Sequence, residues 1–314
     1  MESLFRATEA VTPSKKNFSK KFKRERVAYA FLIVPILWWC VFFLYAFIRA
    51  VYFSFTDLRF SVNQISTFDF DNYIRLFRDA SFGKALANTG IWTAVMTLFN
   101  NLFGLLVAWL VFRLTKGKKL FLALLFWPTL VSAVAGAYVT KLLFNPSDTG
   151  VINSLIIGMG GSPLGWYNDP SISLVTLMIV PSLLGFSTQM MIFYVAIAGV
   201  PPAYVEAARL ETESQAIILV KIYVPLIRNA FTYNVLLSLI GNLKVMAPMQ
   251  LVSDGGKGGP LDSTLTVMLL LYNAGITGYE MGYACAIGVV TLLIILLFSC
   301  IQLVFFGKRG ADYE

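Results

Sequence analysis

Long hydrophobic runs alternate with short polar segments along the chain. Six of the runs are about 20 residues or longer, which is the length of an α-helix that crosses the hydrocarbon core of a bilayer. They lie near residues 27–52, 88–112, 120–144, 172–198, 227–252 and 282–306. The pattern therefore predicts an all-α fold, a polytopic membrane bundle of six transmembrane helices.

Composition also indicates a membrane protein. Hydrophobic residues make up 57% of the 314 positions and charged residues 13%, which is about half the charged share of a soluble domain. The first run, 27–52, is longer than the apolar part of a signal peptide, and it ends in aromatic residues and Arg49 rather than a cleavage site. We therefore expect it to remain as the first helix.

Positive charges indicate the orientation, because flanks rich in Lys and Arg stay in the cytoplasm during insertion. With six helices both termini share one side, and that side would hold 17 of the 25 basic residues. We expect a basic segment (1–26) and a short tail (307–314), both cytoplasmic, to flank the membrane domain (27–306). The net charge of +8 then reflects topology and not nucleic-acid binding. The first segment is either a basic helix on anionic lipid or a disordered tail.

Several kinds of chemistry lack the residues they need. The chain has no histidine, which argues against an intramembrane hydrolase and removes the usual zinc ligand. All 17 acidic residues lie outside the hydrophobic runs, whereas ion-coupled transporters usually carry carboxylates at membrane depth. No phosphate-binding P-loop pattern occurs, and the glycine-rich stretch 254–260 does not open a helix. Cys40, Cys285 and Cys300 lie inside predicted helices as packing residues. The sequence predicts no enzyme, metal site or ATP site in this chain.

One polar stretch stands between two hydrophobic runs and carries the best functional signal. Residues 204–225 read YVEAARLETESQAIILVKIYVP. A short helix from Ala203 to about Glu213 would place Glu206 and Arg209 three residues apart as a weakly stabilising pair. The small side chains in this segment let another backbone approach closely. We expect either a docking helix for a partner protein or an ordinary amphipathic interfacial helix.

This stretch resembles the cytoplasmic loop signature of ATP-binding-cassette importer permeases. The residues that match its spacing are Glu206, Ala207, Ala208, Ile222 and Pro225. Thr212 stands where that family has glycine, and Val224 where it has leucine.

Other segments, in the same order as in that family, resemble its sugar-importer branch, including the larger maltose-transporter permease and the glycerol-phosphate permease. They are Asp71–Tyr73, Asn88–Thr89, Leu125–Pro128, Phe144–Pro146 with Gly150 and Asn153, Gly165–Trp166, Gly255–Pro260 and Met281–Ala284.

The resemblance implies a function and a set of partners. The loop 199–226 would seat in an ATPase subunit, so that closure of the ATPases moves the helices as rigid bodies. The coupling residues implied are Ala203, Glu206, Ala207, Ala208, Arg209 and Thr212. The partners implied are a second homologous permease, two ATPase subunits that bind ATP and Mg, an extracytoplasmic solute-binding protein and the bilayer of the bacterial cytoplasmic membrane.

The resemblance also implies where the solute passes. Its contact positions fall on Leu184, Gly185 and Thr188 in the fourth hydrophobic run, and on Ser238, Gly241, Asn242, Val245 and Ala247 in the fifth. Spacing places Ser238, Gly241, Asn242 and Val245 on one helical face. Ser238 and Asn242 would contact the solute or bond helix to helix. Stacking on a sugar ring would come from elsewhere, with Phe186 and Tyr233 as candidates.

Lys244 is the one cation well inside a hydrophobic run. It would snorkel to the interface, pair with a partner subunit or favour an anionic solute. The main function predicted is a permease subunit of an ATP-driven sugar or oligosaccharide importer. The alternatives are an importer of an anionic solute such as a uronate or glycerol phosphate, an ion-coupled secondary transporter, and a scaffold without a transport path.

Overall fold

The computed structural model describes residues 26–307, apart from 60–64, 66 and 254–255. The described residues are helical in every named element, which confirms the all-α prediction. Among these described residues, five helices are long and apolar enough to cross a membrane, and a sixth span results if one bent helix pair is counted as a single span. The basic N-terminal segment and the C-terminal tail, with the predictions made for them, lie outside the described residues except for Arg26 and Gly307.

The N-terminal part is one apolar helical rod. It comprises α2 (Arg26–Trp39), the π-helical turn η1 (Cys40–Leu44) and α3 (Tyr45–Ser54). Within it Phe31–Ser54 is long and apolar enough to span a bilayer, as the first hydrophobic run predicted.

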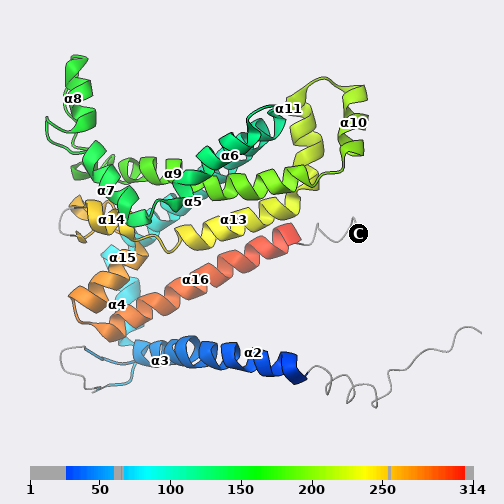
Figure 1. Cartoon of the computed structure of the whole chain (residues 1–314). Helices are drawn as coiled ribbons and strands as arrows, with labels where there is room; N and C mark the ends of the chain where they lie inside the picture. The colour runs from blue at the N-terminus through cyan, green and yellow to red at the C-terminus, as the bar shows by residue number, and fades with distance from the viewer. Residues whose placement is uncertain (1–25, 60–64, 66, 254–255, 308–314) are drawn as a thin grey trace, which may run out of the picture. The chain divides into compact units, whose positions relative to one another are not determined.

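The rest of the described chain forms a second unit (Figure 1). Its main helices are α4 (Asp71–Arg78), α5 (Ala80–Arg113), α6 (Lys118–Phe126), α7 (Ala133–Leu143), α8 (Val151–Gly158), α9 (Ser173–Ala198), α10 (Pro202–Glu211), α13 (Arg228–Asn242), α14 (Ala247–Val252), α15 (Val267–Tyr272) and α16 (Met281–Gly307).

Helices α5 and α9 pack closely along their length. At their crossing, a Cβ on Gly104 would lie 3.0 Å from both the Cβ of Gln189 and the backbone nitrogen of Met190. Small residues at such crossings let helix backbones approach in a membrane, where tight packing replaces the hydrophobic effect. Helix α5 is longer than its hydrophobic run predicted, because Asp79 caps its start by accepting a hydrogen bond from the Ser81 amide at 2.9 Å.

The third hydrophobic run does not form one straight helix. Helix α6 continues into a 3₁₀ turn, η2 (Trp127–Leu130), and α7 follows at an angle of 88°. Pro128 opens the turn, Val131 is extended, and the Ser132 hydroxyl caps α7 by accepting from the Ala135 amide at 3.1 Å. A new cap starts a new helix direction, so the expected continuous span becomes a bent pair.

Two buried hydrophobic clusters hold this unit together. One joins α5, α9, α14, α15 and α16 around Trp92, Leu177, Met249 and Ile287. The other joins the far ends of α5 and α9 to the polar loop at 199–226, through Trp109, Phe193, Val205, Ile218 and Tyr223. The second cluster therefore anchors the predicted docking segment to the long helices.

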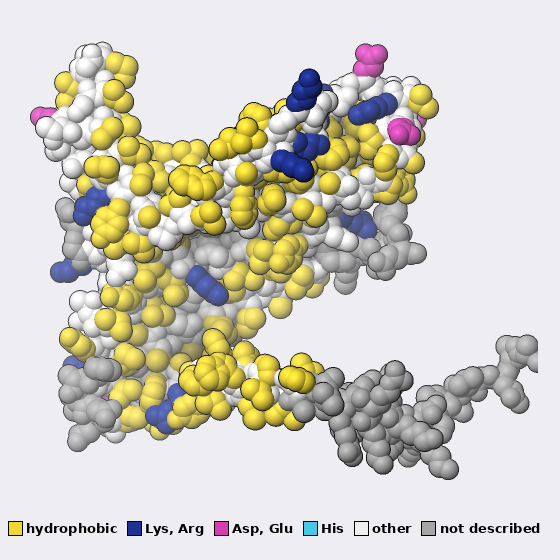
Figure 2. Space-filling model, viewed as in Figure 1, with side chains coloured by type: hydrophobic (Ala, Val, Ile, Leu, Met, Phe, Trp, Pro, Cys, Tyr) yellow, Lys and Arg dark blue, Asp and Glu magenta, His cyan; other side chains and the backbone are white. Residues whose placement is uncertain are grey.

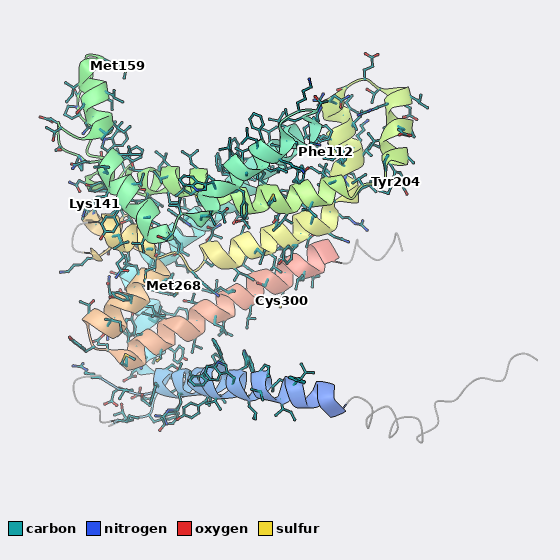
Figure 3. The ribbon with its side chains drawn as sticks, viewed as in Figure 1. Phe112, Lys141, Met159, Tyr204, Met268 and Cys300 are labelled. Atoms are coloured by element: carbon teal, nitrogen blue, oxygen red, sulfur yellow. The ribbon has the colours of Figure 1, made fainter. Side chains whose placement is uncertain are left out.

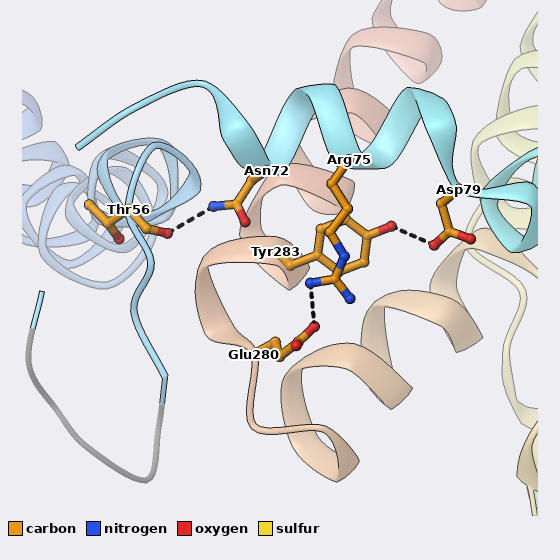
Figure 4. A network of polar contacts seen from close by, with 6 residues as sticks. All are labelled: Thr56, Asn72, Arg75, Asp79, Glu280 and Tyr283. Atoms are coloured by element: carbon orange, nitrogen blue, oxygen red, sulfur yellow. Dashed lines mark hydrogen bonds and ion pairs between the residues drawn. The ribbon is translucent and has the colours of Figure 1, made fainter. Parts of the chain in front are cut away.

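A clasp of polar side chains ties α4 to the start of α16 (Figure 4). Arg75 forms an ion pair with Glu280 at 2.8 Å, and its guanidinium lies 4.1 Å from the centre of the Tyr283 ring. The Tyr283 hydroxyl donates to Asp79 Oδ2 at 2.7 Å. The Asn72 amide donates to the Thr56 carbonyl at 2.8 Å. This clasp accounts for two of the sequence segments that resembled importer permeases.

Candidate coupling surface and solute pathway

The polar loop folds as a short helical hairpin at one end of the second unit (Figure 1). Helix α10 starts at Pro202, and a proline at the first helical position has a backbone already set for a helix. The chain returns through α11 (Gln215–Ile218), the π-helical turn η4 (Leu219–Tyr223) and α12 (Val224–Leu226). The helix predicted from Ala203 is therefore present, and it ends at Glu211.

The structure explains how Thr212 replaces the glycine of the resembled signature. Thr212 ends α10 in an extended conformation, with φ −151° and ψ 139°, which does not require glycine. Its hydroxyl accepts a hydrogen bond from the Ser214 amide at 3.2 Å. The turn is thus stabilised by a side chain and needs no left-handed backbone.

Helix α10 has a buried face and an exposed face. Val205 is 8% exposed, and Ala208 is half-buried against the hydrophobic cluster that anchors the hairpin. Ala203, Glu206, Ala207 and Arg209 are exposed, so four of the six predicted coupling residues are open to a partner. Ala208 faces the bundle, and Thr212 is half-buried in the turn.

The sequence interpretation missed two further exposed residues of helix α10. Leu210 is 91% exposed. Tyr204, which is labelled in Figure 3, is also exposed. Ala203, Ala207 and Leu210 follow the spacing of one helical face. A large apolar side chain on that face, in an otherwise polar loop, was the available signal. We define the exposed face of Ala203, Tyr204, Glu206, Ala207 and Leu210 as the coupling surface.

The predicted pair of Glu206 and Arg209 is not formed. The only ion pair within the described part of the chain is that of Arg75 with Glu280. Arg209 instead influences the ionisation of Tyr223 in η4. Burial raises the pKa of the Tyr223 hydroxyl, and the positive charge of Arg209 partly opposes this shift. Glu206 is thus exposed and makes no ion pair with Arg209.

A hollow of about 260 Å³ lies where the third span bends. Thr129 and Val131 of the bend, Gly136 of α7 and Pro248 of α14 contribute to its wall. Three predicted contact residues on α9 line it as well: Leu184, Gly185 and Thr188. Ala247 directly precedes Pro248 at this wall. The lining residues are uncharged and include two threonine hydroxyls, which suits hydrogen bonding to a neutral polar solute.

Ser238 and Asn242 lie elsewhere, in a polar seam between α5, α9 and α13. Ser238 is 6% exposed, and its hydroxyl oxygen accepts from Gln189 Nε2 at 2.9 Å and from Asn101 Nδ2 at 3.1 Å. The Asn242 amide donates to Thr97 Oγ1 at 3.2 Å. Both side chains therefore bond helix to helix, which was the second of the two alternatives.

The fifth hydrophobic run is broken, and this changes two expectations. Helix α13 ends at Asn242, and Met246 is non-helical before α14 begins. Val245 therefore does not share a helical face with Ser238 and Gly241. Lys244 is exposed at this break rather than inside a helix, and it has no ion pair within the described residues.

The aromatic candidates differ in access. Phe186 is buried and packs edge-on against Phe103, with ring centres 4.8 Å apart, so it is not free to stack on a sugar ring. Tyr233 is exposed. Within the described residues, no group of three or more cysteine or acidic side chains is arranged to hold a metal ion.

The described residues form a multi-pass helical bundle with a bent third span and a helical hairpin anchored under two long helices. Solved structures share this fold. The chain superposes on a chain of a bacterial transporter that imports the acidic polysaccharide alginate with a TM-score of 0.82, at 20% identity, covering 94% of this chain and all of the other. A second alginate-transporter structure, in complex with an alginate-bound periplasmic protein, gives a TM-score of 0.80 at 20% identity, covering 93% of this chain and 98% of the other.

Relatives by sequence are permease proteins of bacterial transport systems. The chain is 27% identical to the arabinooligosaccharides transport system permease protein AraP of Bacillus subtilis, over 91% of this chain and 90% of AraP. It is 28% identical to the diacetylchitobiose uptake system permease protein NgcF of Streptomyces coelicolor, over 92% of this chain and 85% of NgcF. The lactose transport system permease protein LacF of Rhizobium radiobacter is 27% identical over 86% of this chain and 89% of LacF. No protein-family model matches the chain.

These relatives confirm the resemblance that the sequence motifs indicated. The homologues of this chain are permeases of sugar ATP-binding-cassette transporters, which are transmembrane components rather than enzymes. With its apolar helices and bacterial relatives, the chain is a multi-pass protein of the bacterial inner membrane.

Proposed function

We propose that this chain is a permease subunit of an ATP-driven importer that receives a sugar or oligosaccharide from an extracytoplasmic binding protein. The observation that carries the proposal is the coupling surface, which faces outward from a hairpin anchored to α5 and α9. A partner that grips this surface moves both long helices, because their ends share one buried cluster with it. Relatives of known transport systems over nearly the whole chain support the same function.

The expected partners would supply functions for which this chain carries no recognisable residues, such as the binding of ATP. ATP and Mg would bind to two ATPase subunits, one of which holds the coupling surface on the cytoplasmic side, where both termini of this chain also lie. A second permease would complete the pathway, because the hollow at the third-span bend is open. The binding protein would dock on the opposite, outer side, as the alginate transporter complex with its periplasmic protein suggests.

A neutral solute is favoured over an anionic one. The residues around the hollow are uncharged, and an anion would need a basic partner to replace its hydration. Leu184, Gly185 and Thr188 are the contacts that we assign to this subunit. Ser238 and Asn242 hold α13 against α5 and α9 and set the shape of the pathway from behind.

A charge reversal on the coupling surface tests the function. In the complex of all subunits in lipid nanodiscs, we expect Glu206→Lys to lower the ATPase activity stimulated by loaded binding protein about tenfold or more. The reason is that it places a cation where a carboxylate would meet the ATPase. The matched control is Glu213→Lys, which makes the same change on the same hairpin but outside the coupling surface. Equal activity in both variants and the wild type would refute the assignment.

A further inference from the structure

Asn100 is a polar residue of α5 that is buried at membrane depth. It lies at the middle of the hydrophobic run 88–112 and is 5% exposed. Within the described part of the chain, its side-chain oxygen Oδ1 has no hydrogen-bond partner. Hydrophobic side chains dominate the visible face of the bundle (Figure 2), as expected of a surface in lipid. Polar groups at this depth are costly unless they face a cavity or another polar group, so the Asn100 amide requires a partner.

A missing side chain on α9 leaves space beside this amide. A Cβ on Gly185 would lie 2.8 Å from Asn100 Nδ2 and 3.5 Å from Asn100 Oδ1. Gly185 also lines the hollow at the bend of the third span. Any side chain at position 185 would therefore crowd the amide at the wall of the hollow. We refer to the space at this position as the Gly185 gap.

Gly185 lies at the border between two faces of α9. Leu184 and Thr188 line the hollow. Phe186 and Gln189 pack against α5 instead. Because the border residue has no side chain, the Asn100 amide lies next to the hollow rather than behind a side chain of α9.

We propose that Asn100 is a further solute contact, which reaches the hollow through the Gly185 gap. This inference rests on the proposed function, because it requires a solute in the hollow. A carboxamide supplies both a donor and an acceptor. Nδ2 donates to one hydroxyl of a neutral polyhydroxy solute, and Oδ1 accepts from a second. The Thr129 and Thr188 hydroxyls at the same hollow add further hydrogen-bonding groups, so α5 joins the wall that selects the solute.

A purely structural role fits the contacts less well. Asn101, the next residue, bonds helix to helix, since its amide donates to Ser238 Oγ at 3.1 Å. Asn100 Oδ1 makes no such bond within the described residues, so an apolar side chain would fill the same place at lower cost. The hollow beside Asn100 can hold the missing partner. A ligand therefore explains this amide better than packing does.

Replacing the amide by an apolar side chain of similar size separates the two roles. In proteoliposomes with the complete complex and its binding protein, uptake is measured for a panel of neutral di- and trisaccharides. The sugar that the wild type takes up fastest serves as the probe. We expect Asn100→Leu to reduce uptake of the probe per folded complex about tenfold. The thermal midpoint stays the same or rises, because a buried oxygen without a partner has been removed.

Thr93→Val is the matched control. It removes another buried oxygen of α5 that has no partner within the described residues. Thr93 lines a separate groove between α5 and α13 and not the hollow, so the variant leaves uptake unchanged. Equal uptake by Asn100→Leu, Thr93→Val and the wild type would overturn the inference. A lower midpoint with unchanged uptake in Asn100→Leu would show a structural role and overturn it too.

Monodeoxy analogues of the probe give a readout that a structural role does not move. We expect the wild type to take up one such analogue about tenfold more slowly than the probe, and this difference to disappear in Asn100→Leu, because the amide that bound the missing hydroxyl is gone. The binding protein is the same in both complexes, so its own preference cancels. The same ratios in both complexes contradict the inference and leave the proposed function intact. If the wild-type complex takes up no sugar, the proposed function fails, and the inference fails with it.

Discussion

At the scale of single residues, contacts with distant segments of the chain restrict which side chain a position can hold. Gly282 lies where the start of α16 meets the segment after the first span. Its amide donates to the Leu58 carbonyl at 3.0 Å, and a Cβ would collide with the Thr56 carbonyl. Ser238 is constrained differently, because its hydroxyl accepts two amide donors from two other helices. The sequence motif at Met281–Ala284 therefore includes a glycine that close packing requires.

Adding one methyl group tests this packing. We expect Gly282→Ala to lower the free energy of unfolding by about 1–3 kcal/mol, because overpacking against a backbone carbonyl forces a shift of the chain. The measurement is thermal unfolding of the purified chain in detergent, where the midpoint falls by several degrees. Gly90→Ala on α5 is the control, since a Cβ there meets no atom within 4 Å. A midpoint that falls equally in both variants would show that the close contact is unimportant.

At the scale of elements, the faces of helices decide which residues are available to a partner. The polar loop predicted a short helix from Ala203, and the resemblance to importer permeases implied residues of which α10 exposes most. Neither separated Ala208, which packs inward, from Ala207, which is exposed. That separation depends on where Ile218 and Tyr223 return beneath the helix, and local sequence does not fix that position.

The exposed leucine of the coupling surface gives a prediction at this scale. Apolar anchors at the centre of an interface dominate binding, so we expect Leu210→Ala to weaken ATPase association by about 2 kcal/mol, roughly thirtyfold in affinity. Fold and membrane insertion remain unchanged, because the side chain touches little of its own chain. The dissociation constant of the ATPase for the nanodisc-embedded permeases is the measurement. Val220→Ala, an exposed apolar position on η4, is the control and leaves affinity unchanged.

At the scale of the whole molecule, the predicted pathway residues separate into two groups that lie in different places. One group lines the hollow and the other forms the polar seam behind it. The two groups are separate because neighbouring residues of α9 point in different directions. Thr188 lines the hollow, whereas Gln189 contacts α13. Hydroxyl and amide residues in a membrane helix suggest both roles equally, so sequence alone left the choice open.

Substitutions in the two groups should separate transport from stability. We expect Thr188→Phe to reduce solute uptake at least tenfold by filling the hollow, with the thermal midpoint unchanged. Ser238→Ala leaves the Gln189 and Asn101 amides without their shared acceptor, which costs about 1–3 kcal/mol for a buried donor. It should therefore lower the midpoint while uptake per folded complex stays near that of the wild type. The reverse pattern would exchange the two assignments.

The sequence by itself determined the class of this protein, because the length of a hydrophobic run and the polarity of a loop are local properties set by the bilayer. Six runs and one polar loop sufficed to predict the helical membrane bundle and the short helix in that loop. Tertiary structure decided where the third run bends, which face of α10 is open and which polar residues meet each other. These features depend on packing between segments far apart in the chain, such as Asn101 with Ser238 and Thr56 with Gly282. Such a contact contributes free energy only when both segments are in place, so no single stretch of sequence predicts it.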